Sequence, residues 1–341
     1  MTSHQKRSFR GMLVKRSINV VITIFGIMTL NFALIHFMPG DPILNMVPRD
    51  PKLDPAVKES LIAKFNLDAS LFERYTTYLW NTVTLDWGTS YTMSSRSVWD
   101  IISYDMRWTI LLVGTATFFS LIIGMAVGAM AAYRRGGAFD LSSTATGLFF
   151  YGMPIFWFAM LLQEAFSTQL FGMNWWPQLP GGSYYDIVEY GPVFKWELPL
   201  ILSVLEHLIL PSLTLAIASF AGVALVMRSS LIDVMNDDYI LTARAKGLTD
   251  YQILRRHALP NGMPPMVALI AMSIAFTIGG AYQIEYVFNY PGIGYRTIDA
   301  IWELDFPILQ FVVVVGGVAV VVANFIADLV LIYIDPRIKL V

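Results

Sequence analysis

Cysteine is absent from the 341 residues, and charged residues make up only 14% of them. The absence of cysteine excludes disulfide bonds, catalytic thiolates and iron–sulfur ligation by this chain. A net charge of −2 gives no reason to expect nucleic acid as a partner. Hydrophobic residues reach 56% and the mean hydropathy is +0.57, both above the values of soluble domains. This composition is typical of a protein that crosses a lipid bilayer several times.

The sequence also lacks the patterns on which common catalytic sites depend. Its four histidines, His4, His36, His207 and His257, are dispersed without metal-ligand spacing. No Ser-His-Asp or paired-carboxylate pattern stands beside them. No Gly-Lys dipeptide occurs, so the Walker A loop that cradles nucleotide phosphates is missing. We therefore predict a non-enzymatic chain with no cofactor and no metal, so that any ATP hydrolysis takes place on another chain.

Six apolar stretches are long enough to cross the ~30 Å hydrocarbon core, which requires a helix of about 20 residues. They are residues 14–37, 108–133, 141–166, 209–231, 266–286 and 309–334. The first follows a basic start and resembles a signal sequence, but it is long and lacks a small-residue cleavage site, so we interpret it as an uncleaved span. The predicted fold class is all-α, a polytopic membrane protein with about six transmembrane helices and a small helical extracytoplasmic cap.

The positions of Lys and Arg predict the orientation of the chain. Of the 23 Lys and Arg residues, 14 lie in segments on the side of the N-terminus, 2 lie in short loops on the opposite side, and 7 lie in the long segment 38–107. Short cytoplasmic loops carry the excess of positive charge. We therefore place both termini in the cytoplasm and the protein in the cell (inner) membrane. The expected domains are a cytoplasmic N-terminus with the first span (1–37), an extracytoplasmic cap (38–107) and a core of five spans (108–341).

Segment 38–107 carries apolar residues at helical spacing instead of the Gly and Ser of a linker. Asp54 and Pro55 fit the N-cap and first position of a helix with one apolar face, formed by Val57, Leu61, Ile62 and Phe65. A second such face contains Leu71, Tyr75, Tyr78 and Leu79. The pattern predicts a small helical cap on the outer membrane surface; the alternative is an ordered loop without a function.

Aromatic and small residues give two expectations about packing. The loop 171–200 contains Trp175, Trp176, Tyr184, Tyr185 and Trp196. We interpret these aromatic side chains as a belt at the level of the lipid headgroups before a ligand surface. Small residues on the second and third spans favour close helix packing over ligand binding. They are Gly114, Gly124, Gly128 and Gly147, with Ala126 and Ala129.

Polar residues inside the predicted spans are candidates for a transport pathway, because an ionisable group in hydrocarbon is costly unless it faces protein or water. The candidates are Gln163, Glu164, Glu285, Asn324 and Asp328. Asn324 and Asp328 are four residues apart and share one helix face, which should point into the bundle. For each candidate the alternative is an interhelical hydrogen bond that only fixes packing.

The most informative stretch lies in the predicted cytoplasmic loop 233–262, between the fourth and fifth spans. It contains Asp237-Asp238-Tyr239-Ile240-Leu241-Thr242-Ala243-Arg244-Ala245-Lys246-Gly247-Leu248 and continues to Arg255-Arg256-His257-Ala258-Leu259-Pro260-Asn261. The composition favours a short surface helix that ends at Gly247, after which Thr249 and Asp250 open a second helix. Small side chains allow a neighbouring protein to approach, and the basic residues supply a polar rim. From physical grounds alone, a basic loop that only follows the orientation rule is equally acceptable.

Gly247 with Leu259-Pro260 at this spacing resembles the cytoplasmic EAA loop of binding-protein-dependent ABC permeases. Residues 239–248 and 257–259 are most similar to the peptide/nickel branch, and within it to the first of the two permeases of dipeptide and oligopeptide importers. Leu241 stands where the broad family motif has its glutamate, which is normal for the peptide branch, as is Thr242 in place of the first alanine. The similarity continues at His36-Phe37-Met38-Pro39-Gly40-Asp41-Pro42, Tyr286-Val287-Phe288, Pro291-Gly292-Ile293-Gly294 and Asp335-Pro336-Arg337-Ile338.

The resemblance implies a function, a set of partners and a set of site residues. The loop would dock on an ATPase through Asp238, Tyr239, Thr242, Ala243, Arg244, Ala245, Lys246, Gly247, Leu248, Arg255, His257 and Pro260. The implied partners are a second permease, two ATPase subunits that bind ATP and Mg, an external solute-binding protein and membrane lipid. The implied function is that of a permease subunit for di- and oligopeptides, working by alternating access.

Other functions remain open at the level of the sequence. The same machinery could import oligosaccharides or nickel, because cargo choice is largely made by the binding protein. A stand-alone secondary transporter could use Glu285 and Asp328 as ion sites. A membrane scaffold without transport activity is a third alternative, and it would leave the docking loop without a purpose.

Overall fold

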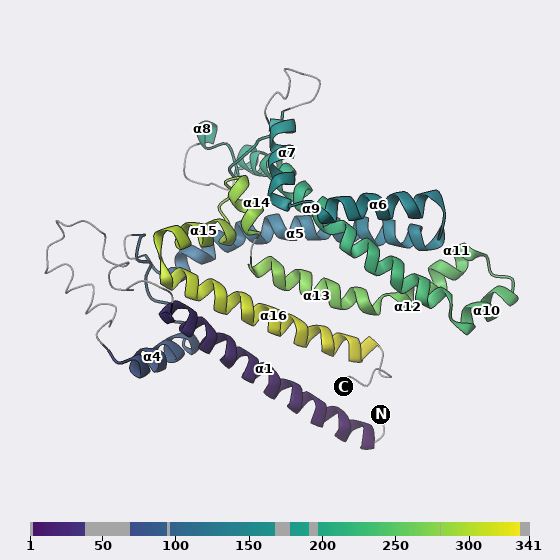
Figure 1. Ribbon diagram of the computed structural model, residues 1–341, viewed down its shortest axis with the longest axis horizontal. Helices are drawn as coiled ribbons and strands as arrows, with labels where there is room; N and C mark the ends of the chain where they lie inside the picture. The colour runs from purple at the N-terminus through teal and green to yellow at the C-terminus, as the bar shows by residue number, and fades with distance from the viewer. Residues whose placement is uncertain are drawn as a thin grey trace. The chain divides into compact units, whose positions relative to one another are not determined.

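The computed structural model describes residues 3–37, 69–93, 96–167, 178–190, 197–279 and 281–334 (Figure 1). Helices dominate these residues, and the β-structure among them is a single antiparallel bridge between Thr89 and Ser97. The prediction of an all-α membrane chain is confirmed. The chain forms two compact units, one of residues 1–106 with 296–322 and the other of residues 107–295 with 323–341.

Four helices of the described chain are long and apolar enough to cross a membrane, with mean hydropathies of 1.9 to 2.5 in their apolar windows. They are α1 (Ser3–Phe37), α5 (Val98–Tyr133), α9 (Leu198–Met235) and α16 (Phe306–Ile334). These helices match the first, second, fourth and sixth predicted spans. Both α5 and α9 begin earlier than the predicted starts at 108 and 209.

Residues 141–166 do not form one straight helix, so the prediction of an uninterrupted third span is wrong. Helices α6 (Ala138–Gly152) and α7 (Ile155–Ser167) meet at an angle of 100°. Met153, with φ −81° and ψ 132°, is extended, as expected for a residue that precedes a proline. Pro154 then lacks the N–H that would continue the helix. With 15 residues, α6 alone spans about 22 Å, which is shorter than the hydrocarbon core.

The fifth predicted span, 266–286, is also interrupted. Helix α13 (Pro264–Gly279) ends before the predicted end, and the short helix α14 (Tyr282–Val287) follows after Ala281, whose φ of −105° and ψ of 68° are not helical. Gly279 is the last residue of α13, and glycine has a low helix propensity.

In the first unit, the amphipathic helix α4 (Leu71–Val83) packs against α1, as Figure 1 shows. This confirms that the second apolar face predicted for the cap is helical, whereas the first, from Val57 to Phe65, lies outside the described residues. Helices α1 and α16 also approach closely, because a Cβ on Gly317 would lie 3.0 Å from Ile27. Just before α16, the buried Asp305 accepts hydrogen bonds from Ser90 and from Thr92, whose hydroxyl is 3.0 Å away.

In the second unit, α9 is the central helix and contacts α6, α7, α13, α14 and α12 (Leu259–Gly262) (Figure 1). The small residues act as predicted at three of the four glycines. A Cβ on Gly124 or Gly128 would overlap α9, and one on Gly147 would lie 3.2 Å from Ala221, whereas Gly114 has open space beside it. Close contact of α5 and α6 with α9 therefore depends on glycine.

The aromatic loop departs from the prediction of a headgroup belt. Tyr184 and Tyr185 are 9% and 0% exposed and lie in a core with Trp108, Leu208 and Phe288. That interpretation is wrong for these two tyrosines, because their rings are buried in protein. Trp175, Trp176 and Trp196 lie outside the described residues.

Candidate functional site

Helix α10 (Asp238–Ala245) opens the segment that the sequence singles out, directly after α9. It contains six of the predicted site residues: Asp238, Tyr239, Thr242, Ala243, Arg244 and Ala245. The helix is followed by its C-cap Lys246, and Gly247 has a φ of +82°. The Gly247 N–H donates to Arg244 O at 2.9 Å and the Leu248 N–H to Ala243 O at 3.3 Å, which are the two bonds of a Schellman motif. The prediction that Gly247 ends this helix is confirmed.

The next helix, α11 (Asp250–Ile253), also starts where the sequence predicts. Thr249 is its N-cap and forms a capping box with Gln252: the Gln252 N–H donates to the Thr249 hydroxyl at 3.3 Å, and the Thr249 N–H donates to the Gln252 side chain at 2.9 Å. An exposed ion pair of 3.5 Å joins Arg244 to Asp250 across the turn. The Schellman motif and the capping box therefore define the two ends of the turn between α10 and α11.

A π-helical turn (η2, Leu254–Ala258) follows α11 and contains Arg255 and His257, and Pro260 then lies in α12. In a π turn each N–H reaches one residue further back, and the Leu259 N–H donates to Leu254 O. Pro260 has no N–H and its ring would clash with the carbonyl four residues earlier in a regular α-helix. The wider turn relieves that conflict, and sequence reasoning did not foresee it.

The segment has one buried side and one exposed side. Ile240, Ala243 and Ile253 form a small core on which Leu248 packs. The other side exposes Leu241 at 68%, Tyr251 at 61% and Tyr239 at 40%. Burial raises the pKa of the Tyr239 hydroxyl, and the nearby Asp237 carboxylate acts in the same direction. The exposed side also carries the basic residues Arg244, Lys246, Arg255 and Arg256.

The segment is firmly attached to α9 at its far end. Leu254 and Ala258 of η2 share a core with Leu231 of α9 and Met266 of α13. The Ser230 hydroxyl donates to Gly262 O at 2.8 Å, and a Cβ on Gly262 would lie 2.9 Å from the Leu231 side chain. The far end of the segment is therefore part of the same packed core as α9 and α13.

The pathway candidates lie on three helices, and the structure gives two of them clear packing contacts. The Gln163 amide on α7 donates to the carbonyls of Gly181 and Val287. Glu164 beside it is exposed. On α16, Asn324 is exposed and Asp328 half-buried, one helical turn apart.

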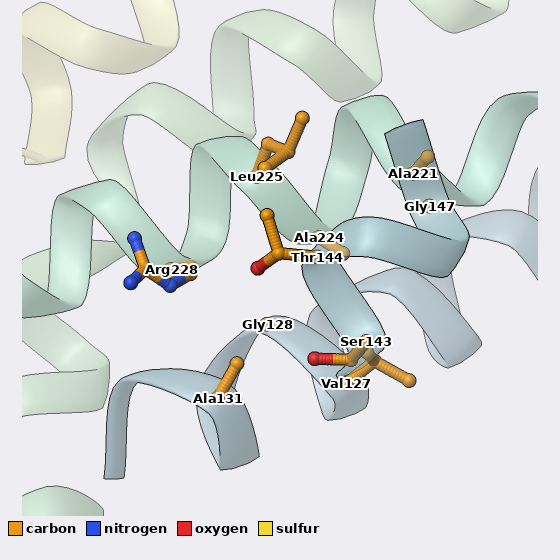
Figure 2. A pocket seen from close by; sticks show the side chains of 10 residues that line it. All are labelled: Val127, Gly128, Ala131, Ser143, Thr144, Gly147, Ala221, Ala224, Leu225 and Arg228. Atoms are coloured by element: carbon orange, nitrogen blue, oxygen red, sulfur yellow. The ribbon is translucent and has the colours of Figure 1, made fainter. Parts of the chain in front are cut away.

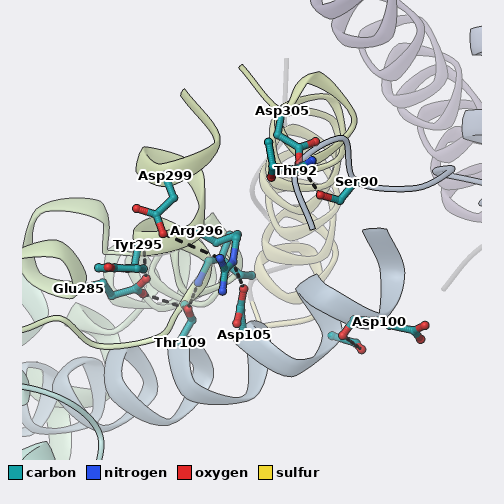
Figure 3. Close-up of polar contacts among 12 residues, drawn as sticks. Ser90, Thr92, Asp100, Asp105, Thr109, Glu285, Tyr295, Arg296, Asp299 and Asp305 are labelled. Atoms are coloured by element: carbon teal, nitrogen blue, oxygen red, sulfur yellow. Dashed lines mark hydrogen bonds and ion pairs between the residues drawn. The ribbon is translucent and has the colours of Figure 1, made fainter. Parts of the chain in front are cut away.

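Glu285 on α14 is 0% exposed, and its carboxylate lies in a cradle of donors (Figure 3). One oxygen accepts from the Thr109 hydroxyl at 2.9 Å and the Ala281 N–H at 3.2 Å, and the other accepts from the Tyr295 N–H at 3.0 Å. A Cβ on Gly292 would overlap both Glu285 and Thr109. The Pro-Gly-Ile-Gly motif thus wraps this carboxylate, and these contacts favour the packing alternative for Glu285.

Two ion pairs were missed by sequence reasoning. In the second unit, Arg228 of α9 forms a bidentate pair with the 4% exposed Asp140 of α6, with Nη2 2.8 Å from Oδ2. Arg228 borders a pocket whose other walls are small or apolar residues of α5, α6 and α9, as Figure 2 shows. In the first unit, Arg296 contacts the buried Asp105 at 2.8 Å (Figure 3). In the sequence, each of these residues is visible only as a single charge within or beside an apolar run, and nothing indicates its partner.

Metal binding has no support in the described part of the chain, where no three His, Asp or Glu side chains are grouped to hold an ion.

Comparison with protein families gives a match that covers most of the core. Residues 124–340 match the family described as binding-protein-dependent transport system inner membrane component. The chain is 33% identical over 327 residues to the oligopeptide transport system permease protein AppB of Bacillus subtilis (strain 168), covering 96% of this chain and 98% of that protein. It is 32% identical over 333 residues to the dipeptide transport system permease protein DppB of Escherichia coli (strain K12), covering 94% and 96%.

Two further comparisons extend this picture. The glutathione transport system permease protein GsiC of Escherichia coli O1:K1 / APEC is 31% identical over 327 residues, covering 96% of this chain and 98% of that protein. Among solved structures, a chain of the MetNI methionine ABC transporter in an inward-facing conformation matches with a TM-score of 0.52 and 15% identity. The match covers 69% of this chain and 96% of the MetNI chain. At that identity the structural match shows a shared fold alone.

Proposed function

The chain belongs to the family of binding-protein-dependent transport system inner membrane components, and from this premise we propose that it is a permease subunit of an ATP-driven peptide importer. Relatives named for oligopeptide, dipeptide and glutathione transport match 94–96% of the chain. Their names support peptides as the cargo over oligosaccharides or nickel. The range that matches the family, residues 124–340, includes the loop with Gly247 and Leu259-Pro260 on which the resemblance is based.

The observation that carries the coupling role is the two-sided segment Asp238–Gly262. Its exposed side combines Leu241 and Tyr251 with four basic residues, and its buried side joins it to α9. Exposed apolar side chains within a polar rim are characteristic of a surface that another protein covers. We propose that an ATPase subunit docks here and contacts the predicted site residues from Asp238 to Pro260.

Coupling would then be mechanical. ATP-driven closure of two docked ATPase subunits would displace α10 and α11, and the shared core of Leu231, Leu254, Ala258 and Met266 would carry the displacement into α9 and α13. The ATP and Mg would be bound by the ATPase chains. A second permease would complete the pathway, and an external binding protein would deliver the peptide. This arrangement requires both termini in the cytoplasm, which the Lys and Arg distribution supports.

For the pathway itself, we propose Asn324 and Asp328 as lining residues, with Glu164 as a further candidate. Asn324 and Glu164 are exposed and Asp328 is half-buried, so part of each side chain lies at the surface of this chain. Gln163 and Glu285 have structural contacts that account for their burial. A stand-alone transporter that uses Glu285 as an ion site is disfavoured, because three donors of this chain already occupy its oxygens.

Co-purification tests the proposal. The chain, its second permease and the ATPases of the same source are co-expressed, and an affinity tag on the chain recovers the complex in detergent for ATPase assay. We expect Leu241→Asp to reduce the recovered ATPase at least about tenfold, because a carboxylate would be buried without a partner in the docked surface. The fold should survive, since Leu241 is 68% exposed.

Val188→Asp is the matched control. Val188 is 98% exposed on helix α8 (Ile187–Tyr190), so the same apolar-to-acidic change is made outside the coupling segment. Its ATPase recovery should equal that of the wild type. Recovery of the wild-type chain without any ATPase, or equal ATPase recovery with Leu241→Asp, would count against the proposal.

A further inference from the structure

Helix α4 has an exposed apolar face to which neither coupling nor the pathway assigns a role. Successive residues of a helix are turned by about 100°, so Phe72, Thr76, Trp80 and Val83 lie on one side. Phe72 is 76% exposed, and Trp80 and Val83 are each 70% exposed. Side chains of this size, exposed in a row, need an apolar partner.

A second face of α4 is fixed to a spanning helix. The Tyr75 and Thr29 hydroxyls are 2.7 Å apart, and the Asn31 amide donates to the Tyr78 hydroxyl at 3.1 Å. The Phe32 ring packs against both tyrosine rings, with centroids 5.1 and 5.5 Å away. The same Asn31 amide donates to the Gln310 carbonyl of α16 at 3.2 Å. Helix α4 is therefore attached to α1 by specific contacts.

These contacts set the depth of α4 in the membrane. Thr29, Asn31 and Phe32 lie inside the apolar span Val14–Leu34 of α1. At 1.5 Å per residue, they lie roughly 3–8 Å before Leu34 along the helix axis. Because α1 crosses the bilayer, a helix that packs on these residues lies at the level of the outer acyl chains and not above the headgroups.

The remaining side of α4 is polar, so the helix has one face suited to lipid and another suited to water. Thr77 is exposed there, about 100° around the helix from Thr76, and the exposed Glu73 stands at the border with the apolar face, about 20° beyond Trp80. On the apolar face, the Thr76 hydroxyl bonds to the carbonyls of Phe72 and Glu73 at 3.1 and 3.0 Å. That hydroxyl is satisfied within the helix, as membrane-buried threonine requires, because lipid offers no hydrogen-bond partner.

We infer that α4 is an in-plane membrane helix whose face of Phe72, Thr76, Trp80 and Val83 lies against lipid acyl chains. The leaflet is the one that the C-terminal part of α1 enters, which is the outer leaflet in the proposed orientation. The aromatic Phe72 and Trp80 are suited to this boundary, and the polar face with Glu73 and Thr77 meets headgroups and water. The helix would thus anchor the segment between α1 and α5 in the bilayer, instead of forming a cap above it.

Adjacent threonines supply a matched test, and this chain has no native cysteine that would also be labelled. Thr76→Cys on the apolar face and Thr77→Cys on the polar face are each spin-labelled in the full complex, reconstituted into vesicles of phosphatidylethanolamine and phosphatidylglycerol. Collisions with oxygen, which concentrates in acyl chains, are compared with collisions with a water-soluble nickel chelate. The ratio of oxygen to nickel accessibility should be at least about fivefold higher at residue 76 than at residue 77.

Val83→Cys provides a second label on the apolar face in case the first variant does not assemble. Equal nickel accessibility at residues 76 and 77 would overturn the inference, because the helix would then lie in water. Labels at residues 76 and 83 that neither reagent reaches would also overturn it, since a protein would cover the face. The inference depends on α1 crossing the membrane and not on the cargo, so peptide uptake by the same vesicles, measured in parallel, tests the proposed function separately.

Discussion

A side chain at Gly247 should strain the turn between α10 and α11 without creating a clash. Gly247 has a φ of +82°, and a Cβ built there has no heavy atom within 4 Å. The cost is therefore conformational, about 1–2 kcal/mol for an L-residue in the left-handed region. Valine should cost more than alanine because of its β-branch, whereas asparagine tolerates this conformation and should cost less.

A strain of about 1–2 kcal/mol lowers the ratio of capped to uncapped α10 by about 5- to 30-fold. Most of the fold should be unaffected, because the residue is exposed and stands in a surface turn. The assay is the number of ATP molecules hydrolysed per peptide imported into proteoliposomes. We expect this number to rise in the order glycine, asparagine, alanine, valine, with the amount of assembled complex unchanged.

Gly88 is the control, because its φ is +68° and its Cβ would also meet open space. Gly88→Val therefore imposes similar strain outside the coupling segment. Its ratio of hydrolysis to uptake should equal that of the wild type. The reasoning is refuted by Gly247→Val with normal coupling, or by Gly88→Val with the same loss of coupling.

Three further predictions concern the polar groups. Glu285→Gln replaces a carboxylate oxygen with an N–H₂ group that faces donors, so the free energy of unfolding should fall by about 2–4 kcal/mol, seen as a lower Tm of the purified complex; an unchanged Tm would contradict the cradle. Asp140→Asn removes the charge that pairs with the partly exposed Arg228, and a loss of about 1–3 kcal/mol should again lower the Tm, whereas wild-type stability would mean that the pair contributes little. Asp328→Asn should leave assembly intact but alter peptide uptake; loss of the folded complex with normal cargo selectivity would assign Asp328 to packing.

Features that depend on neighbouring residues in the sequence could be predicted. Gly247 ends α10, Thr249 caps α11, and the apolar runs at α1, α5, α9 and α16 form helices, because caps and hydrophobic runs act locally.

Features that depend on distant residues could not be predicted. Hydropathy treats residues 141–166 as one run, and it has no term for the bend that Pro154 imposes on an apolar segment. Glu285 and Asp140 were each visible as single charges, but their partners Thr109 and Arg228 lie 176 and 88 residues away. Tyr185 is buried because α5 and α14 pack beside it. The sequence of the loop 171–200 does not indicate that these helices lie there.

The most direct test of the docking assignment is a photo-crosslinker incorporated at position 241 in the full complex, followed by identification of the adduct by mass spectrometry. Leu241 is 68% exposed on α10, so the label should not disturb the buried side of the helix. We predict a covalent adduct between this chain and an ATP-hydrolysing subunit. An active complex in which position 241 crosslinks to no ATPase, or is modified from outside the cell by a membrane-impermeant reagent, would contradict the docking role.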